Sequence, residues 1–266
     1  MIKPYRPFQP TLTETGLKRF GLSLESSPAC AALRSVVHSY LQISASEPTP
    51  YPVIPDGTQA IFISPHGSMI GGSQTQTHDI QILEPGSYFG IRFYPGALRH
   101  LFELNLSEVT DQMVDSHYFP CRLFRELHNG IYQQSLFRGR AQVCEQWVLQ
   151  NLLPQANAQF DHALSLIYQS FGAIKVAQLA TMVGWSSRHL NRMFRFHTGL
   201  STKAFTQTIR IQHACKQLHL APRNSLSSAY ELGYFDQSHL IKDYKKHLLL
   251  NPSLFFDRFK SDFYNS

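Results

Sequence analysis

Four polar side chains in the last third of the chain are spaced so that one short helix would present them together. Arg188, Asn191, Arg192 and Arg195 stand at positions i, i+3, i+4 and i+7 of a helix that begins near Ser187. Arginine can bind guanine or phosphate, and asparagine can bind adenine. We therefore predict that this helix face, including Ser187, contacts nucleic acid.

The residues before this face indicate how the helix is held. Residues 176–183 carry their apolar side chains at helical spacing, and Gly184 follows at a position where a helix can end with a positive φ. Either Ser186 or Ser187 can then cap the basic helix. A helix, a glycine turn and a basic helix together form the helix-turn-helix pattern.

The same pattern occurs a second time further along the chain. Gly233 marks the end of the first helix of this copy, and Leu240, Tyr244 and Leu248 form the apolar face of the second helix. The polar residues predicted to contact DNA from this second helix are Gln237, Ser238, His239, Lys242, Lys245 and Lys246. Two copies make a nucleic-acid interface a stronger prediction than one copy would.

Between the two copies, residues 201–220 have the pattern of one continuous helix. Ser201 can cap its start, and Pro222 follows its end. A helix of about 20 residues spans roughly 30 Å, close to the roughly 34 Å of one turn of B-DNA. Two recognition helices joined in this way could enter neighbouring major grooves of one duplex.

Length and charge indicate two domains. The chain has 266 residues, and from Gly172 onward it contains 13 Lys and Arg against 5 Asp and Glu, which leaves 11 against 13 for the remainder. A polar linker at 154–157 separates a predicted N-terminal domain, residues 1–154, from a predicted DNA-binding domain, residues 158–266. A basic C-terminal part beside a mildly acidic N-terminal part suits a polyanion-binding module joined to something else.

The N-terminal part is predicted to be rich in β-strands. Short apolar stretches such as 59–64, 80–83 and 88–93 are separated by turns containing Gly and Pro, which indicates a small β barrel or sandwich. We expect residues 44–52 to form a loop, residues 95–104 a helix and residues 120–153 a helical region. The fold class is therefore α+β, with a C-terminal all-α domain.

A small-molecule site, if present, should lie in this β domain. Arg92 and Tyr94 are its most eligible polar residues, because they precede the Pro95-Gly96 turn and could meet a ligand. A buried arginine could neutralise an anionic ligand, but an ion pair with Asp56 or Glu84 is the alternative. Both interpretations stay open at this point.

The C-terminal motifs resemble the DNA-binding domain of AraC/XylS-type transcription regulators. The matching residues include Gly184-Trp185-Ser186, His189-Leu190 and Gly199 in the first copy, and Gly233-Tyr234 with Asp236-Gln237-Ser238-His239-Leu240 in the second. The resemblance implies a sequence-specific regulator that binds double-stranded DNA, with RNA polymerase as a further partner and with activation or repression of transcription as its mode. This chain departs from the family at Leu249, where a glycine is usual, and at Lys242, where arginine is frequent.

The N-terminal part resembles an uncharacterised domain found in some regulators of the same type. The resemblance depends on Pro55-Asp56-Gly57, the stretch 90–97 and the stretch 106–111. It implies a role in sensing a small-molecule effector or in assembly, and it makes a homodimer paired through the helices at 120–153 an expected form.

Other functions are less well supported by the sequence. His66 and His78 lie in the β domain without a known metal-ligand spacing, and Cys30, Cys121, Cys144 and Cys215 are scattered, so we expect no metal, no cofactor and no enzyme. No secretion signal or membrane span is recognisable, which predicts a cytoplasmic protein without a membrane partner. An architectural DNA binder without a ligand and a metal-dependent β-barrel enzyme fused to a DNA-binding domain are the alternatives.

Overall fold

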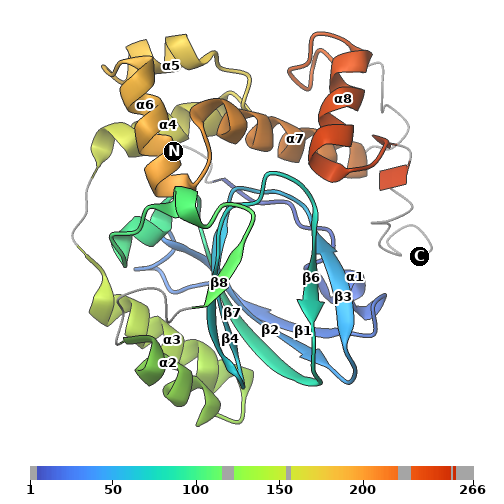
Figure 1. Cartoon of the computed structure of the whole chain (residues 1–266), viewed down its shortest axis with the longest axis vertical. Helices are drawn as coiled ribbons and strands as arrows, with labels where there is room; N and C mark the ends of the chain where they lie inside the picture. The colour runs from blue at the N-terminus through green and yellow to red at the C-terminus, as the bar shows by residue number, and fades with distance from the viewer. Residues whose placement is uncertain (1–4, 116–122, 154–156, 221–228, 253, 256–266) are drawn as a thin grey trace.

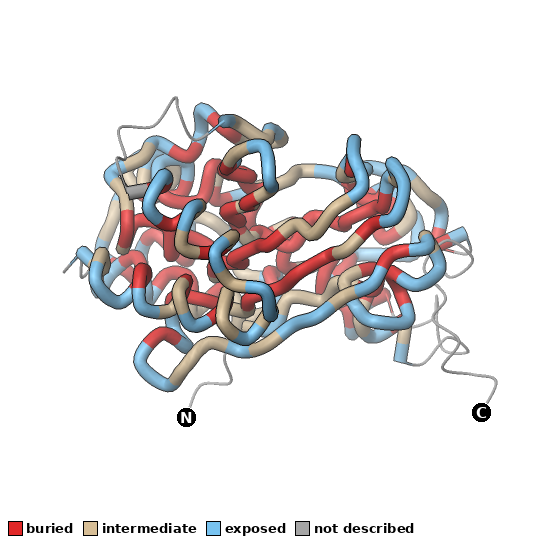
Figure 2. The backbone as a smooth tube through the Cα atoms, turned by 90° about the horizontal axis from the view of Figure 1, so that it is seen from below, coloured by how far each residue is buried: buried red, intermediate tan, exposed pale blue. Residues whose placement is uncertain are grey.

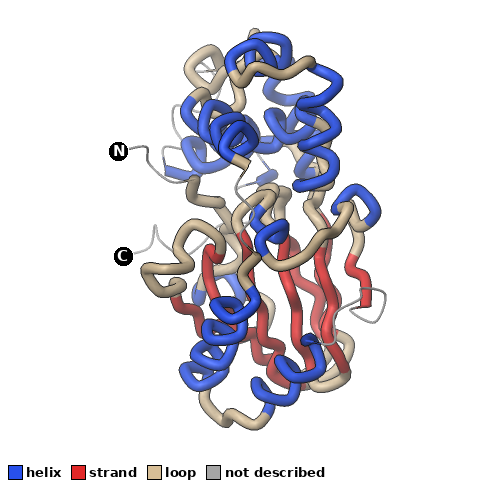
Figure 3. Tube along the Cα trace, turned by 90° about the vertical axis from the view of Figure 1, so that its left-hand side faces the viewer, coloured by secondary structure: helices blue, strands red, loops and turns tan. Residues whose placement is uncertain are grey.

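The computed structural model describes residues 5–115, 123–153, 157–220, 229–252 and 254–255. A unit built mainly from β-strands lies below a unit built from helices (Figure 1). The same division into a strand layer and a helical layer is visible from the side (Figure 3). The α+β class predicted from the sequence is confirmed.

A six-stranded antiparallel sheet forms the centre of the N-terminal unit, in the order β1-β2-β7-β4-β5-β8. Its strands are β1 (Ser23–Ser27), β2 (Val37–Ala45), β4 (Gln59–Ser64), β5 (Gly67–Gly71), β7 (Gly86–Phe93) and β8 (Met113–Asp115). The short helix α1 (Glu14–Lys18) precedes β1 and is capped by the hydroxyl of Thr13, which accepts from the N–H of Gly16.

A second sheet consists of β3 (Thr49–Val53) and β6 (His78–Ile82). The prediction that residues 44–52 form only a loop was wrong, because β2 continues to Ala45 and β3 begins at Thr49. Pro50 and Pro52 had favoured the loop. They are tolerated because the described β3 pairs only with β6, so the missing N–H groups interrupt no second ladder.

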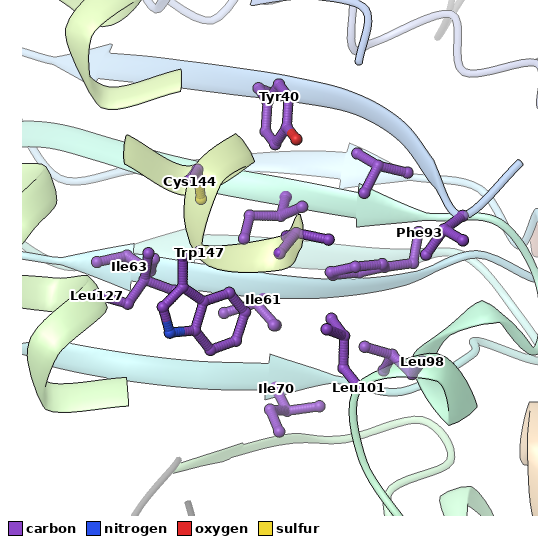
Figure 4. Packing of buried hydrophobic residues seen from close by; sticks show 14 of the residues in the cluster. Tyr40, Ile61, Ile63, Ile70, Phe93, Leu98, Leu101, Leu127, Cys144 and Trp147 are labelled. Atoms are coloured by element: carbon purple, nitrogen blue, oxygen red, sulfur yellow. The ribbon is translucent and has the colours of Figure 1, made fainter. Parts of the chain in front are cut away.

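The two faces of the six-stranded sheet have different partners. One face packs against helices α2 (Leu123–Tyr132) and α3 (Phe137–Asn151), and buries Ile61, Ile63 and Phe93 beneath Leu127 and Trp147 (Figure 4). Full burial of one such side chain contributes about 1.5–3 kcal/mol. The other face turns Leu41 and Ile43 toward Tyr51, Val53 and Ile82 of the two-stranded sheet, which gives the sandwich arrangement.

The predicted helical region at 120–153 is divided into two helices. Residues 133–136 form the turn, and the side chain of Arg140 closes it by donating from Nε to the carbonyl oxygen of Gln134 at 3.0 Å. The turn lets both helices bring apolar residues to the same face of the sheet. Residues 116–122 lie outside the described part of the chain, so the prediction is not tested there.

The predicted helix at 95–104 was too long. The structure has a 3₁₀ helix, η1 (Ala97–His100), that starts after Gly96 with φ 75°. Leu98 and Leu101 are both buried, and their spacing of three residues matches the 3₁₀ repeat. A second short 3₁₀ helix, η2 (Leu106–Glu108), follows and is capped by Asn105.

The C-terminal unit contains α4 (Ala158–Gln169), α5 (Val176–Met182), α6 (Ser187–Thr198), α7 (Thr202–Leu220) and α8 (Gln237–Leu248). Its buried residues form two clusters joined by α7. Phe205 and Ile209 pack with the first helix-turn-helix, whereas Ala214 and Leu218 pack with the second. Viewed from below, buried segments run through the middle of the molecule, and many exposed segments lie at its periphery (Figure 2).

Candidate nucleic-acid interface

Helix α6 is held by local interactions at both ends. Its N-cap is Ser186, whose hydroxyl accepts from the N–H of His189 at 3.2 Å. Gly184 before it and Gly199 after it have φ values of 71° and 81°, which glycine adopts without strain. These turns fix where the helix starts and stops, and therefore which residues it presents.

The apolar face of α6 is buried. Leu190 and Phe194 are fully covered, and His197 is 8% exposed. Burial lowers the pKa of His197 from 6.5 to about 4, and the nearby Arg99 guanidinium adds to this shift. His197 is therefore neutral at neutral pH and serves as part of the core.

The opposite face of α6 is basic and open to solvent. Arg188, Arg192 and Arg195 are exposed, as is Ser187. Arg192 donates from Nη2 to Nδ1 of His189 at 3.0 Å, which holds its guanidinium at the start of the helix. The structure thus brings together the cations that the sequence assigned to this face.

Asn191 has a different environment from the arginines. Its side chain is half-buried, and its Oδ1 accepts from the N–H of Thr202 at 3.1 Å, so that it caps α7. A contact with adenine through both ends of the amide needs this oxygen as an acceptor. In the conformation observed, one of the two acceptor positions of the Asn191 oxygen is already used by α7.

Helix α8 repeats the construction of α6. Its N-cap is Asp236, whose carboxylate accepts from the N–H of His239 at 2.7 Å, and it follows Gly233 with φ 79°. The exposed polar residues are Gln237, Ser238, Lys242, Lys245 and Lys246, and His239 is half-buried. Lys246 donates to Gln207 of α7 at 2.9 Å. All the residues predicted for the second basic helix therefore lie on α8 and remain accessible.

A histidine packed on an aromatic ring occurs in both motifs. His189 lies edge-on to Trp185, with ring centroids 4.7 Å apart, and His239 lies edge-on to Tyr234 at 5.2 Å. In each case Nδ1 is a hydrogen-bond acceptor, from Arg192 or from the N–H of Phe235. Trp185 and Tyr234 each follow a glycine directly, and this packing role was not predicted from the sequence.

The acidic residue on α8 does not reduce the positive charge of this face. Asp243 is buried and accepts from Arg210 of α7 at 2.9 Å. Arg210 also lies over the ring of Tyr234, 4.9 Å from its centroid. The ion pair is thus directed into the core, and the three lysines of α8 keep their charge toward solvent.

Leu249 is the C-cap of α8, at the position where the family resemblance leads to the expectation of glycine. It keeps the glycine conformation, with φ 58° and ψ 20°, and its side chain is 55% exposed. A left-handed conformation costs a residue with a Cβ atom about 1–2 kcal/mol. The turn after α8 is therefore preserved, at the expense of strain.

The two residues predicted for a ligand site are not brought together. Arg92 is buried and forms an ion pair with Asp56, which decides between the two acidic partners considered above. Glu84 instead lies at the surface, 2.7 Å from His66. Tyr94 lies in a different place, edge-on to His38 at 5.4 Å. Arg92 lines a cavity of about 390 Å³ between the two sheets, whereas Tyr94 lines a separate cavity beside α4.

A loop from β3 to β4 connects that cavity to the helical unit. Asp56 contacts Arg92 inside the β unit, while the neighbouring Ile54 is buried in the core of the second helix-turn-helix. The carbonyl oxygen of Pro55 accepts from Gln212 of α7 at 2.9 Å. The two predicted domains therefore share a core contact across this loop.

The other residues considered for chemistry have structural contacts. His78 lies 3.3 Å from Asp111, and Cys30, Cys144 and Cys215 are free thiols, while Cys121 is outside the described residues. Within the described part of the chain, no group of three His, Cys, Asp or Glu residues is arranged to hold a metal ion. None of the helices in the described residues is long and apolar enough to cross a membrane.

Comparisons with known proteins match both parts of the chain. Residues 179–258 match a helix-turn-helix domain family, and residues 25–115 match a domain of unknown function, DUF6597. The C-terminal part thus belongs to the AraC type of helix-turn-helix domains. The chain as a whole joins this domain to an N-terminal DUF6597 domain.

Two curated relatives agree with this assignment. An uncharacterized HTH-type transcriptional regulator of Haemophilus influenzae is 29% identical over 34% of the chain and 30% of its own length. The uncharacterized HTH-type transcriptional regulator YbfI of Bacillus subtilis is 34% identical over 25% of the chain and 24% of its own length. The matches thus span less than a third of the length of these relatives.

Solved structures with a similar course of the chain include ToxT from Vibrio cholerae O395, at 10% identity and a TM-score of 0.42. That match covers 91% of this chain and 99% of ToxT. The AraC-like transcriptional activator CuxR matches at 9% identity and a TM-score of 0.24, over 86% of this chain and 98% of its own. At these scores the likenesses add nothing to the assignment.

Proposed function

We propose that this protein is a sequence-specific DNA-binding transcription regulator of the AraC type and not an enzyme. The observation that carries the proposal is the pair of capped helices, α6 and α8, whose exposed faces are basic. Helix α7 joins them and has 19 residues. Its length is roughly 28 Å, which suits the separation of neighbouring major grooves on one side of a duplex.

The two helices are proposed to contribute differently. Arg188 and Arg192, with Ser187, lie at the start of α6 and would reach base edges, because the N-terminal part of a recognition helix enters the groove. Asn191 would contact DNA chiefly as a donor through its amide nitrogen, since its oxygen already accepts from the N–H of Thr202. Lys242, Lys245 and Lys246 would contact phosphate as point charges, with Gln237, Ser238 and His239 nearest the bases.

Selection of binding sequences from random DNA duplexes tests this proposal. We expect a site of two parts whose centres lie about one helical turn apart. A matched protein in which Lys203, an exposed residue on α7, is changed to alanine should select the same site. Recovery of no preferred sequence, or of RNA in preference to duplex DNA, would refute the proposal.

We further propose that the N-terminal domain makes this regulator responsive to an effector. The support is the shared loop: Asp56 meets the cavity through Arg92, and Pro55 meets α7 through Gln212. A ligand that moves this loop would also move the helix that separates α6 from α8. If a ligand changes the affinity of the protein for DNA by some factor, DNA must change the affinity of the protein for that ligand by the same factor.

The test is made on the whole chain, because Ile54 belongs to the core of the helical unit. DNA affinity is measured with and without the small-molecule fraction of a cell extract, for the natural protein and for Gln212→Leu. We expect the extract to change the affinity of the natural protein and to have a smaller effect on the variant. Gln178→Leu, an exposed change on α5, is the matched control.

An unchanged affinity in every condition would support the alternative of an architectural DNA binder without a ligand.

We also propose a homodimer paired through α2 and α3, since Leu136 and Leu149 are 72% and 43% exposed there. Pairing would raise affinity for tandem sites above that for a single site. Action in the cytoplasm and contact with RNA polymerase complete the proposal.

A further inference from the structure

The cavity between the two sheets of the N-terminal domain has a mainly apolar wall. It encloses about 390 Å³, at the small end of the range for ligand sites. Apolar side chains from both sheets line it, among them Leu41, Val53, Phe62, Met69 and Met113. A ligand held here would need an apolar body, because most of its surface would lie against these residues.

Two polar side chains in this wall have unused hydrogen-bonding capacity. Tyr51 is 3% exposed, and its hydroxyl makes no hydrogen bond to any described residue. Arg92 is 7% exposed and uses Nη2 toward Asp56 and Thr58, which leaves its other donors without a partner among the same residues. Burial raises the pKa of Tyr51, with Arg92 opposing the shift, so the hydroxyl stays a donor at neutral pH.

The charge of Arg92 is already compensated. Asp56 is 4% exposed and accepts from Arg92, from Gln9 at 2.8 Å and from the hydroxyl of Thr58 at 2.6 Å. The carboxylate of Asp111 also borders the cavity, and no lysine or second arginine does so within the described residues. An anionic ligand would therefore find no lysine or second arginine in this wall to pair with, and burying its own charge would be costly.

We infer that this cavity binds a small uncharged molecule with an apolar body and an oxygen acceptor that meets Tyr51 and Arg92. The inference rests on the proposed function, since an effector-responsive regulator requires such a ligand. The two are tested separately, because binding of a ligand to the cavity is measured without DNA. A protein that binds no DNA could still bind this ligand, and a protein that does not bind the ligand could still bind DNA.

The experiment compares three probes with the same skeleton and different charge: cinnamamide, cinnamate and cinnamylamine. Calorimetric titration of the full-length protein at neutral pH should give binding of cinnamamide about tenfold tighter than of either charged probe. Tighter binding of cinnamate would show an anion site, and tighter binding of cinnamylamine would show that Asp111 controls the site. Either result, or no binding of any probe, would overturn the inference.

Two variants locate the site and its polar contact. Tyr51→Phe should weaken the binding of cinnamamide about fivefold by removing one hydrogen bond, with little effect on the binding of cinnamate. Ala60→Leu places a larger side chain on the cavity wall and should abolish binding of all three probes. Unchanged cinnamamide binding in both variants would show that the probe binds elsewhere and would refute the assignment, provided that circular dichroism confirms folding.

Discussion

Acidification is expected to weaken the contact between α6 and the rest of the protein through His197. The ring is packed near Phe160 and Phe196, with centroids 4.9 and 5.1 Å away, and its Nδ1 is buried without a hydrogen-bond partner among the described residues. Burial first, and then the charge of Arg99, lowers its pKa from 6.5 to about 4. The folded state therefore resists protonation of this ring.

The direction of the pH effect follows from this lowered pKa. The unfolded chain takes up a proton at His197 as the pH falls below 6.5, whereas the folded chain does so only near pH 4. Stability from this group is complete above pH 6.5 and is lost between 6.5 and 4. Because one pKa unit corresponds to about 1.4 kcal/mol, we expect a loss of about 2 kcal/mol between pH 7 and pH 5.

The assay is urea unfolding of the natural protein and of His197→Phe at both pH values. Phenylalanine fits an aromatic environment and cannot be protonated, so the variant should lose about 2 kcal/mol less stability than the natural protein on acidification. Other buried histidines, such as His38, act equally in both proteins and cancel in the comparison. His162→Gln, an exposed change on α4, should leave the pH dependence unchanged. A difference between the natural protein and His197→Phe below about 0.5 kcal/mol would refute the reasoning.

The remaining predictions concern the helix-turn-helix domain. Arg192→Ala should cost about 1–3 kcal/mol of DNA-binding free energy and relax specificity at one base pair, as measured by binding to single-base variants of the selected site. Lys245→Ala should weaken binding to all DNA sequences alike and lower the slope of log affinity against log salt by about one. The same sequence-independent loss of affinity in both variants would contradict the division into a base-reading helix α6 and a phosphate-binding helix α8. Leu249→Gly should stabilise the protein by about 0.5–1 kcal/mol in urea unfolding by releasing the left-handed strain, whereas Leu249→Ala, which keeps a Cβ atom, should not.

Local sequence determined the helix-turn-helix motifs. Ser201, Gly184 and Gly233 mark helix ends through backbone conformations and caps that depend only on neighbouring residues. The apolar spacing of Leu240, Tyr244 and Leu248 likewise determines which face of α8 is buried, and hence which face presents its lysines. These features involve residues within a few helical turns of one another, so they can be predicted without a structure.

Contacts between residues far apart in the chain were decided only by the tertiary structure. The oxygen of Asn191 accepts from the N–H of Thr202 because the turn after α6 brings Thr202 back to it, and this bond competes with the adenine contact that its residue type suggests. Arg92 pairs with Asp56 and not with Glu84, because the sheet order places β7 beside β4, whose preceding loop carries Asp56. Ile54 packs in the core of the second helix-turn-helix, although more than 150 residues separate it from the helix α7 residues it joins there. Its neighbour Pro55 accepts a hydrogen bond from Gln212 over a similar sequence separation. Hydrophobic burial is not directional, so no local pattern in the sequence identifies which distant surface a residue will cover.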